Sequence, residues 1–391
     1  MVEEFSLPTE NGLTSLTGDL MLHNTDSQAT ATLLMVPGGW FAERDGFMGD
    51  TYTEADLMYL RIARRVHERG FFVARYDNRG VRGNEFSIGI KKDSPDPFED
   101  TKQYFKHCVD SEVRQSVTPE TQVSDLATVH RFVTKYPGVD PANVVVFAHS
   151  EGGIHTARLI GRKQDTKNMF NPKGVVFAGA IAGSPCEVMR WQLIDRYVDE
   201  VMSWDRDSDG VVNKGDVEEC FSTSYLKEVG ISKDSLCPPI VGWTEAELRQ
   251  FFAASYEEQK SAALLVPDDV PFPLRDENND GQPDDHHLDY VAASHRWLKQ
   301  FYSDETSMIS LLKTYGGRVA YHFGELDRQL SCEHQIRHIT ANSHSMACDP
   351  KSVMHDNRGH AFASSKPVAG PMDVEAEDLF VREISAMLTA N

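Results

Sequence analysis

The chain has 391 residues, which at roughly 150 residues per domain allows two or three compact units. Hydrophobic residues make up 40% and charged residues 25% of it, the ordinary balance of a globular protein with a buried core. The longest apolar run, over 174–183, falls short of the roughly 18 residues that a membrane span needs. The net charge of −21 repels phosphate backbones and argues against a nucleic-acid partner.

The six cysteines form no CxxC pair and show no zinc-finger spacing. We therefore expect buried thiols, although the even number also permits disulfides. The first residues contain neither the basic nor the apolar segment of a signal peptide. A cytoplasmic location is therefore expected, and an extracytoplasmic one only if the N-terminus has been trimmed.

Strands and helices alternate through the first half of the chain. Short apolar runs bounded by turns predict strands, and apolar residues at helical spacing predict helices between them. The predicted strands cover residues 30–36, 71–76, 143–148 and 174–183, and the predicted helices cover 55–69, 123–136 and 151–162. Strands that alternate with helices predict a mostly parallel sheet with helices on both faces, which is an α/β fold.

The alternation stops between residues 186 and 312, where helical and loop patterns dominate. It then resumes, with predicted strands over 318–323 and 352–355 and a closing helix over 374–388. The simplest domain organisation is one α/β core made of residues 1–185 and 313–391. Residues 186–312 are then an insertion, which we expect to fold as a cap.

The segment over 148–153 carries the strongest chemical signal in the chain. It reads Ala-His-Ser-Glu-Gly-Gly, follows a predicted strand and opens a predicted helix, which is the context of a nucleophile elbow. Small flanking residues allow the sharp turn that would hold the hydroxyl of Ser150 above the sheet. Position 148 is alanine where the strict G-x-S-x-G pattern has glycine, but the turn needs only a small residue there. The alternative is a serine that merely caps a helix.

A serine hydroxyl becomes a good nucleophile only when a base takes its proton and a carboxylate orients that base. In an elbow of this kind the acid, and then the histidine, follow later strands. Asp327 and His360 each follow one of the two late predicted strands. Glu325 and His355 compete with them, but we expect Glu325 in the turn and His355 inside the strand. The predicted catalytic set is therefore Ser150, Asp327 and His360.

Two backbone N–H groups are expected to hold the oxyanion that forms when an acyl group is attacked. One is the N–H of Glu151, which begins the predicted helix after the nucleophile. The other is the N–H of Gly39 or Trp40, in the Gly-rich turn after the first predicted strand. Glycine there would let the backbone approach a substrate closely, and a plain turn is the alternative. The Asp-Asn-Arg-Gly turn over 77–80 is interpreted as scaffold braced by its arginine.

Four segments, taken in order, resemble the α/β-hydrolase superfamily, and in particular its serine carboxylesterases with a Gly-His-Ser-Glu-Gly-Gly elbow. That pattern has a Gly-rich turn ending in Asp-Arg-Asp-Gly, then Arg-Tyr-Asp-x-Arg-Gly, then the elbow, then Gly-Glu-x-Asp. Residues 38–46, 75–80, 148–153 and 324–327 correspond to these four segments. The resemblance covers the α/β core from about residue 30 onward and does not extend to the insertion. The elbow departs from the pattern at Ala148.

The resemblance implies an α/β-hydrolase fold in which Ser150 is the nucleophile, His360 the base and Asp327 the group that orients the base. The two backbone amides named above would hold the oxyanion. The expected reaction is hydrolysis of a small-molecule carboxylic ester with a short to medium acyl chain, through an acyl-enzyme. It requires no cofactor for catalysis.

The same residues are also compatible with other functions. The three catalytic groups would also serve a peptidase or an acyltransferase. The serine at the elbow disfavours dehalogenase and epoxide-hydrolase chemistry, which would use an aspartate there. A calcium-dependent binding module on an inactive hydrolase scaffold is the alternative from another class. Trp40, Phe41 and Trp243 are candidate apolar residues of the pocket, and the oligomeric state is left open.

Two acidic loops in the insertion predict structural calcium sites. The first follows the twelve-residue EF-hand template over 205–216, with glycine at the sixth position and aspartate instead of glutamate at the twelfth. Its expected ligands are Asp205, Asp207, Asp209, Val211 (through its carbonyl) and Asp216. The second loop repeats the first half of the template, and its expected ligands are Asp276, Asn278, Asp280, Gln282 and Asp284. A solvated turn rich in Asp and Asn is the alternative for both.

Overall fold

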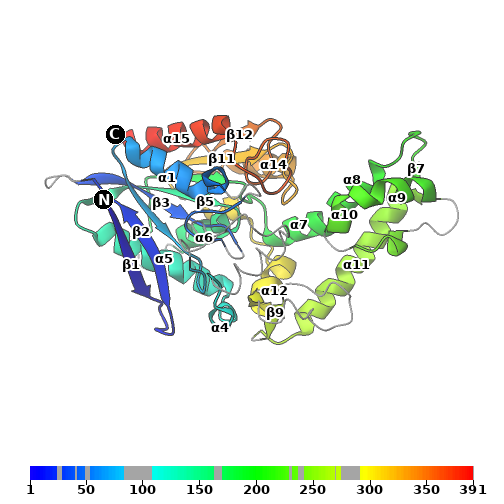
Figure 1. Cartoon of the computed structure of the whole chain (residues 1–391), viewed down its shortest axis with the longest axis horizontal. Helices are drawn as coiled ribbons and strands as arrows, with labels where there is room; N and C mark the ends of the chain where they lie inside the picture. The colour runs from blue at the N-terminus through cyan, green and yellow to red at the C-terminus, as the bar shows by residue number, and fades with distance from the viewer. Residues whose placement is uncertain are drawn as a thin grey trace.

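The computed structural model describes residues 1–23, 29–39, 42–48, 53–82, 108–162, 170–228, 231–236, 242–268, 270–273 and 291–390. Figure 1 shows a sheet flanked by helices at one end of the molecule, where both chain termini lie. Helices from α7 (Pro185–Arg190) to α11 (Glu245–Leu265) project from that end toward the other.

The core is an eight-stranded sheet. Across the sheet the strands are β1 (Val2–Pro8), β2 (Ser15–Met21), β4 (Phe72–Tyr76), β3 (Thr30–Val36), β5 (Val139–His149), β6 (Gly174–Ala178), β11 (Arg318–Gly324) and β12 (Lys351–His355). All pairs from β4 to β12 are parallel, and the β1–β2 and β2–β4 pairs are antiparallel. The carboxyl ends of the parallel strands therefore meet at one edge, which is where sites form in such sheets.

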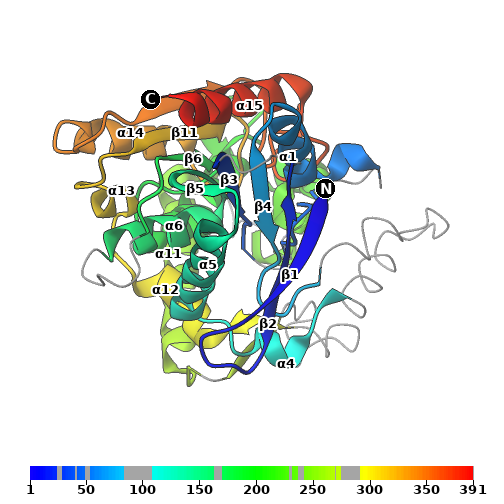
Figure 2. The same ribbon diagram turned by 90° about the vertical axis from the view of Figure 1, so that its left-hand side faces the viewer.

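Helices cover both faces of the sheet. The described helices of this part of the chain are α1 (Met58–Glu68), α4 (Ser111–Arg114), α5 (Pro119–Lys135), α6 (Glu151–Gly161), α13 (Met308–Leu311), α14 (Cys332–Ser343) and α15 (Val374–Thr389). In Figure 2, α15 lies at the top of the view and α1 beside β4 at the upper right, whereas α5 and α6 lie to the left of β4 and β1. The two pairs of helices pack in different hydrophobic clusters, one on each face of the sheet. No helix in the described ranges is both long and apolar enough to cross a membrane.

Burial on both faces explains the unbroken apolar runs of the central strands. Successive side chains of a strand point to opposite faces. Leu33 of β3 and Phe147 of β5 belong to the hydrophobic cluster that includes α1 and α15. Their neighbours Leu34 and Val146 belong to the cluster that includes α5 and α6. A strand in this position needs apolar residues at every position, so its sequence shows no alternation.

The expected insertion forms the projecting helices and a hydrophobic core of its own. Val198, Leu248 and Phe252 are buried together there. Met308 and Ile309 of α13 lie within the expected insertion but pack in the core of the sheet. The described elements between α7 and α13 are a π-helical turn (Trp191–Asp195), α8 (Arg196–Met202), β7 (Val211–Val212), α9 (Lys214–Cys220), a 3-10 turn (Phe221–Thr223), α10 (Tyr225–Glu228), a second 3-10 turn (Asp234–Leu236), β8 (Trp243–Thr244), α11, β9 (Pro271–Pro273), β10 (Val291–Ser294) and α12 (His295–Ser303).

The parallel sheet confirms the predicted α/β fold, with two differences in its strands. The antiparallel β1–β2 hairpin was not indicated by the sequence pattern. The strand predicted over 174–183 ends at Ala178, because Gly179, with φ 55°, turns the chain. The apolar residues that follow stay buried without being a strand. The N–H groups of Ala182 and Gly183 instead donate to Oε1 of Gln335, at 2.8 and 3.0 Å.

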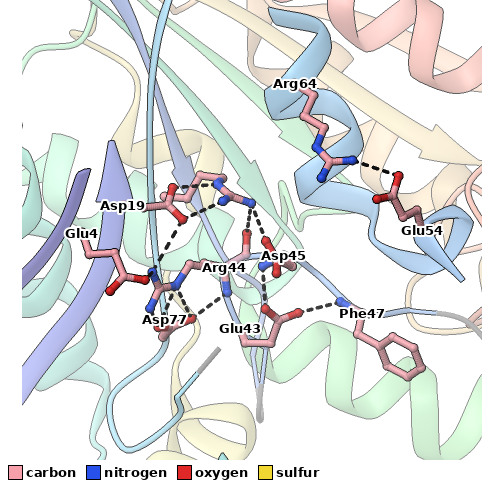
Figure 3. A network of polar contacts seen from close by, with 10 residues as sticks. Glu4, Asp19, Glu43, Arg44, Asp45, Phe47, Glu54, Arg64 and Asp77 are labelled. Carbon is pink, nitrogen blue, oxygen red and sulfur yellow. Dashed lines mark hydrogen bonds and ion pairs between the residues drawn. The ribbon is translucent and has the colours of Figure 1, made fainter. Parts of the chain in front are cut away.

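A buried network of charged side chains fixes the loop that follows β3 (Figure 3). Arg44 pairs with Asp77, with Nη2 2.8 Å from Oδ2, and lies 3.5 Å from Asp19. Arg75 pairs with Asp19 at 2.6 Å and with Asp45 at 2.5 Å. These five side chains belong to residues that are at most 5% exposed. Arginine charges are tolerated at this depth because each of them faces carboxylates.

The buried side chain of Glu43 stabilises the same loop through hydrogen bonds to its backbone. Its carboxyl oxygens accept the N–H groups of Asp45, at 2.6 Å, and Phe47, at 2.9 Å. Burial, together with the neighbouring charge of Asp45, raises the pKa of Glu43 to about 8. The loop is therefore folded around a carboxyl group that is mostly protonated at neutral pH.

Removing a charge from this network should cost more stability than removing an exposed ion pair. We expect Asp77→Ala to lower the free energy of unfolding by about 3–5 kcal/mol, because it removes the closest carboxylate from the buried charge of Arg44 and leaves only the more distant carboxylates of Asp19 and Glu4. The control is Arg64→Ala, which removes only the exposed Arg64–Glu54 pair also drawn in Figure 3 and should cost at most about 1 kcal/mol. Urea denaturation measures both losses, and equal losses would contradict this explanation.

Candidate active site

Ser150 lies at a sharp turn between β5 and α6. Its backbone has φ 50° and ψ −123°, in a region that residues other than glycine rarely adopt. The N–H of Ser150 donates to the carbonyl of Ala178 in the neighbouring strand β6, at 2.9 Å. Gly152 must lack a side chain, because a Cβ there would lie 2.4 Å from the carbonyl oxygen of Pro37. This strand, turn and helix have the geometry of a nucleophile elbow.

Two further side chains, from loops after β11 and β12, meet at this turn. Nε2 of His360 lies 2.9 Å from Oγ of Ser150, and Nδ1 of His360 lies 2.7 Å from Oδ2 of Asp327. The other oxygen of Asp327 accepts the backbone N–H groups of Gln329, at 2.7 Å, and Leu330, at 3.2 Å. With Nδ1–H donating to the carboxylate, Nε2 is the nitrogen that can accept the serine proton. The structure thus brings together Ser150, His360 and Asp327.

The two competing candidates face elsewhere. Glu325 is exposed, and its Oε2 accepts the N–H of Asn357 at 2.7 Å. His355 is buried at the end of β12, where its Nε2 lies 2.9 Å from Nδ1 of His322. Burial lowers the pKa of His355 to about 4. In the part of the chain that the structure describes, neither side chain hydrogen-bonds the nucleophile.

The Gly-rich turn after β3 lies directly against the elbow. A Cβ at Gly39 would lie 2.0 Å from Oε2 of Glu151, so a side chain at this position would force the carboxyl group of Glu151 to move. Glu151 begins α6, and N–H groups in the first turn of a helix have no partner within the helix. The Gly-rich turn and the start of α6 are therefore neighbours, and both the N–H of Gly39 and the N–H of Glu151 lie close to Ser150. Trp40, the alternative donor, lies outside the described residues.

The turn over 77–80 supports the Gly-rich turn. Nδ2 of Asn78 donates to the carbonyl of Gly38 at 2.7 Å. Because a peptide unit is planar, this bond also sets the direction of the N–H of Gly39, the next residue. The turn itself is held by two hydrogen bonds from Arg79 to Asp125 on α5, at 2.5 and 2.9 Å. The arginine thus braces the turn, as the sequence analysis expected.

A cavity of about 550 Å³ opens beside Ser150. Ser150 and His360 line one side of it, and residues of α7, the π-helical turn, α11 and α12 line much of the rest, together with residues of α6 and of the loops beside it. These helices contribute mainly apolar side chains, such as Val188, Ala263 and Phe301. No lysine, arginine or aspartate is present among the described lining residues. The volume is typical of small-molecule sites, and the lining favours an uncharged ligand.

Glu151 places a buried carboxyl group beside the nucleophile. Its Oε1 accepts the indole N–H of Trp297, on α12, at 2.5 Å and lies 3.6 Å from Nε2 of His155. Burial raises the pKa of Glu151 to about 7 and lowers the pKa of His155 to about 3. Both side chains are therefore mostly neutral below pH 7. An ionised Glu151 would oppose negative charge forming at its own amide.

The positions of two tryptophans relative to the cavity differ from what the sequence indicates. Trp297 was not identified as a site residue, because a tryptophan on a helix is usually a core residue. Trp243, a candidate pocket residue, does not line the described cavity. Its Nε1–H donates to the carbonyl of Leu236 at 2.7 Å, and its ring lies against Phe251. Trp243 therefore belongs to the core of the projecting helices. Phe41, like Trp40, lies outside the described residues.

The first acidic loop brings three carboxylates together. Oxygens of Asp205, Asp207 and Asp209 lie within 4.8 Å of one another. Oδ1 of Asp205 is buried and has no hydrogen-bond partner within the described ranges. A hydrogen bond to Asp205, together with the charge of Asp209, raises the pKa of Asp207. This crowding of carboxylates is of the kind that a bound cation relieves.

The other expected calcium ligands lie outside this cluster of three carboxylates or outside the described residues. Asp216, at the twelfth position, accepts the N–H of Asn213 at 3.0 Å at the start of α9. Val211 lies in β7 and pairs with Thr244 of β8. The second acidic loop, with Asp276, Asn278, Asp280, Gln282 and Asp284, lies outside the described residues. Calcium binding by either loop stays a prediction.

No protein-family model matches this chain, and no curated protein matches it in sequence. In structure it is similar to a lipase in its open form, with a TM-score of 0.50 and 12% identity over 100% of both chains. It is also similar to a hyperthermophilic esterase from the archaeon Pyrobaculum calidifontis, with a TM-score of 0.48 and 13% identity over 100% of this chain and 83% of that one. It is similar as well to an α/β-hydrolase from Penicillium sp. sh18, with a TM-score of 0.46 and 14% identity over 99% of this chain and 98% of that one. The likeness to the lipase, together with the strand order, shows that this chain has an α/β-hydrolase fold.

The raised pKa of Glu151 predicts a loss of stability with rising pH. A carboxyl group whose pKa rises from 4.5 to about 7 on folding stabilises the fold fully only below pH 4.5, and this contribution is lost as the pH rises to about 7. Relative to Glu151→Gln, we expect the wild-type free energy of unfolding to fall by about 3 kcal/mol between about pH 4.5 and 7.5. Urea denaturation at a series of pH values measures the difference, and a constant difference would contradict a protonated Glu151.

Calcium is predicted to stabilise the first acidic loop. We expect calcium at about 1 mM to raise the melting temperature by a few degrees relative to a chelator, because the ion binds only the folded loop. Asp205→Asn should abolish the rise. Asp234→Asn, which changes an exposed aspartate outside the loop, should retain it. Thermal melts in calcium and in chelator test the site, and identical melting temperatures in both would contradict it.

Proposed function

We propose that this protein is a serine carboxylesterase in which Ser150 is the nucleophile, His360 the general base and Asp327 the residue that orients the base. The observation that carries the proposal is the continuous hydrogen-bonded chain from Oγ of Ser150 through His360 to Asp327. This chain lies beside a cavity with a mainly apolar described lining. The likeness in fold to a lipase agrees with ester hydrolysis as the reaction class.

In this mechanism the ester is cleaved through an acyl-enzyme. Nε2 of His360 takes the proton of Ser150 as Oγ attacks the ester carbonyl, and Asp327 stabilises the imidazolium that forms. The carbonyl oxygen becomes an oxyanion, which the N–H groups of Gly39 and Glu151 stabilise. The intermediate collapses and expels the alcohol, which takes the proton from His360. A water molecule then attacks the acyl-enzyme in the same way and releases the acid.

Residues 186–312 act, in this proposal, as a cap that selects the substrate. Helices α7, α11 and α12 line the cavity beside the nucleophile. The bond from Trp297 of α12 to Glu151 joins the cap directly to the elbow. Side chains that exclude water from the cavity would strengthen the interaction of the oxyanion with its N–H donors.

The substrates would be uncharged esters with short to medium acyl chains. An ionised group on the substrate would lose its hydration in the cavity, whose described walls contain no lysine, arginine or aspartate and a single carboxyl group, that of Glu151, which is mostly protonated below pH 7. Desolvating a charge without a partner is costly. The apolar side chains of the cap would instead gain from contact with the alkyl part of an ester.

Initial rates on p-nitrophenyl esters with acyl chains of two to sixteen carbons test the proposal. We expect the wild type to be active, with its optimum among the shorter chains, and Ser150→Ala to lose at least about 10³-fold in kcat/KM. A wild type that is inactive on every ester, or a variant that keeps its rate, would show that the proposal is wrong. Amide substrates and acyl acceptors would then test a peptidase or an acyltransferase.

A matched pair of variants tests the assignment of the acid. Asp327→Asn should lower kcat by about 10⁴-fold, because the amide no longer holds the histidine in the productive tautomer. Glu325→Gln changes a carboxyl group two residues away that bonds only the backbone of Asn357 among the described residues. It should keep the wild-type kcat. Equal effects of the two variants would contradict the role proposed for Asp327.

A further inference from the structure

A buried hydrogen-bonded chain passes behind the nucleophile. The N–H of Gly38 donates to Oη of Tyr59, on α1, at 3.0 Å. The same oxygen lies 2.8 Å from Nδ1 of His149, the last residue of β5. On the other side of the ring, Nε2 of His149 lies 3.4 Å from the backbone carbonyl oxygen of His360. These hydrogen bonds therefore connect the Gly-rich turn after β3, which bears the proposed oxyanion donor Gly39 and is called the oxyanion loop below, to the residue proposed as general base.

With a neutral imidazole at His149, only one arrangement of protons satisfies every link of this chain. The N–H of Gly38 can only donate, so Tyr59 accepts it and directs its single proton to Nδ1 of His149. Nε2 of His149 then carries the ring hydrogen and donates it to the carbonyl of His360, which can only accept. Burial lowers the pKa of His149 to about 3. The ring is therefore neutral, as the arrangement requires.

The chain is packed as well as bonded. Tyr59 is 2% and His149 1% exposed, and their rings meet edge to face with centroids 5.6 Å apart. A Cβ at Gly46 would lie 2.5 Å from the ring of Tyr59, so the loop after β3 closes tightly over that ring. Neither residue lines the described cavity beside Ser150. The ring of His149 also packs against the ring of His360, with centroids 5.1 Å apart. Both residues can therefore affect a reaction there through the groups that they hold and contact.

We propose that Tyr59 and His149 are positioning residues, which hold the oxyanion loop and the backbone of His360 at a fixed separation on either side of Ser150. The inference rests on the proposed esterase function, since it assigns both residues a role in that reaction. Gly38 directly precedes Gly39, so a shift of Gly38 moves the proposed oxyanion donor with it. A displacement of about 1 Å costs about 10²-fold in rate. Binding of the substrate in its ground state depends much less on these groups.

The variant Tyr59→Phe removes one oxygen atom and breaks both hydrogen bonds of Tyr59 while it keeps the ring. We expect kcat for p-nitrophenyl butyrate to fall about 10- to 100-fold, with KM changed by less than about threefold. Tyr321→Phe is the matched control. Tyr321 is also fully buried, but its hydroxyl has no hydrogen-bond partner within the described part of the chain. The control should keep the wild-type kcat.

A transition-state analogue separates positioning from a purely structural role. An alkyl trifluoromethyl ketone adds to the serine: the Oγ–carbon bond forms, the ketone oxygen takes the negative charge, and the serine proton moves to His360. This adduct needs the oxyanion donors and the base in place. In Tyr59→Phe we expect affinity for the ketone to fall in parallel with kcat/KM. Affinity for the corresponding alcohol, which cannot form the adduct, should change by less than about threefold.

A second variant makes the test independent of the first. His149→Gln should lower kcat to a similar extent, and the double variant should be no slower than the slower single variant, because both changes break one chain. His149→Gln also provides the same test if Tyr59→Phe does not fold, which thermal melts reveal.

The outcomes are distinct. Parallel losses of kcat and of ketone affinity in a folded variant support the inference. A wild-type kcat in Tyr59→Phe, even with a lowered melting temperature, overturns the inference and leaves the proposed function intact. A wild-type protein that hydrolyses no ester overturns the proposed function and the inference together.

Discussion

The left-handed backbone of Ser150 is the constraint on which the rest of the site depends. A residue other than glycine held at φ 50° is strained by about 1–3 kcal/mol, so the surroundings must hold it there. The N–H of Ser150 bonds to the carbonyl of Ala178 on β6, and Gly152 packs against the carbonyl of Pro37. These contacts come from the two strands beside β5. The packing that holds the strained turn therefore also brings the oxyanion loop to the hydroxyl.

The scaffold and the cavity differ in their charged groups: the scaffold contains buried ion pairs, whereas the described lining of the cavity has few ionisable side chains. The chain carries a net charge of −21, and the buried Arg44 and Arg75 are matched to carboxylates in one network. The described lining of the cavity contains no lysine, arginine or aspartate, and burial keeps Glu151 mostly protonated below pH 7. In the proposed reaction the developing oxyanion would thus meet backbone N–H dipoles with little competing negative charge nearby, which is the condition under which such donors are most effective.

The elbow is held from two sides by hydrogen bonds of different origin. Trp297, on α12, donates its indole N–H to the side chain of Glu151 from the side of the cavity. Tyr59 and His149, from the sheet and its covering helix, bond behind it. The first contact depends on where the cap lies, whereas the second contact depends only on the core.

Local signals in the sequence determined the fold class and the order of the site residues. A buried parallel sheet requires unbroken apolar strands, and a sharp turn at Ser150 requires small neighbouring residues. Both requirements fix the residue types of a short continuous segment, so both can be recognised in the sequence. The preference for Asp327 over Glu325 followed from its position after a strand, and the structure brings Asp327 to His360. The end of β6 at Ala178 and the contacts of Trp297 and Tyr59 were decided only by tertiary structure. Trp297 meets Glu151 from 146 residues away, and Tyr59 meets His149 from 90 residues away. Periodicity shows which face of a helix is buried, but the partner on that face depends on how distant elements pack.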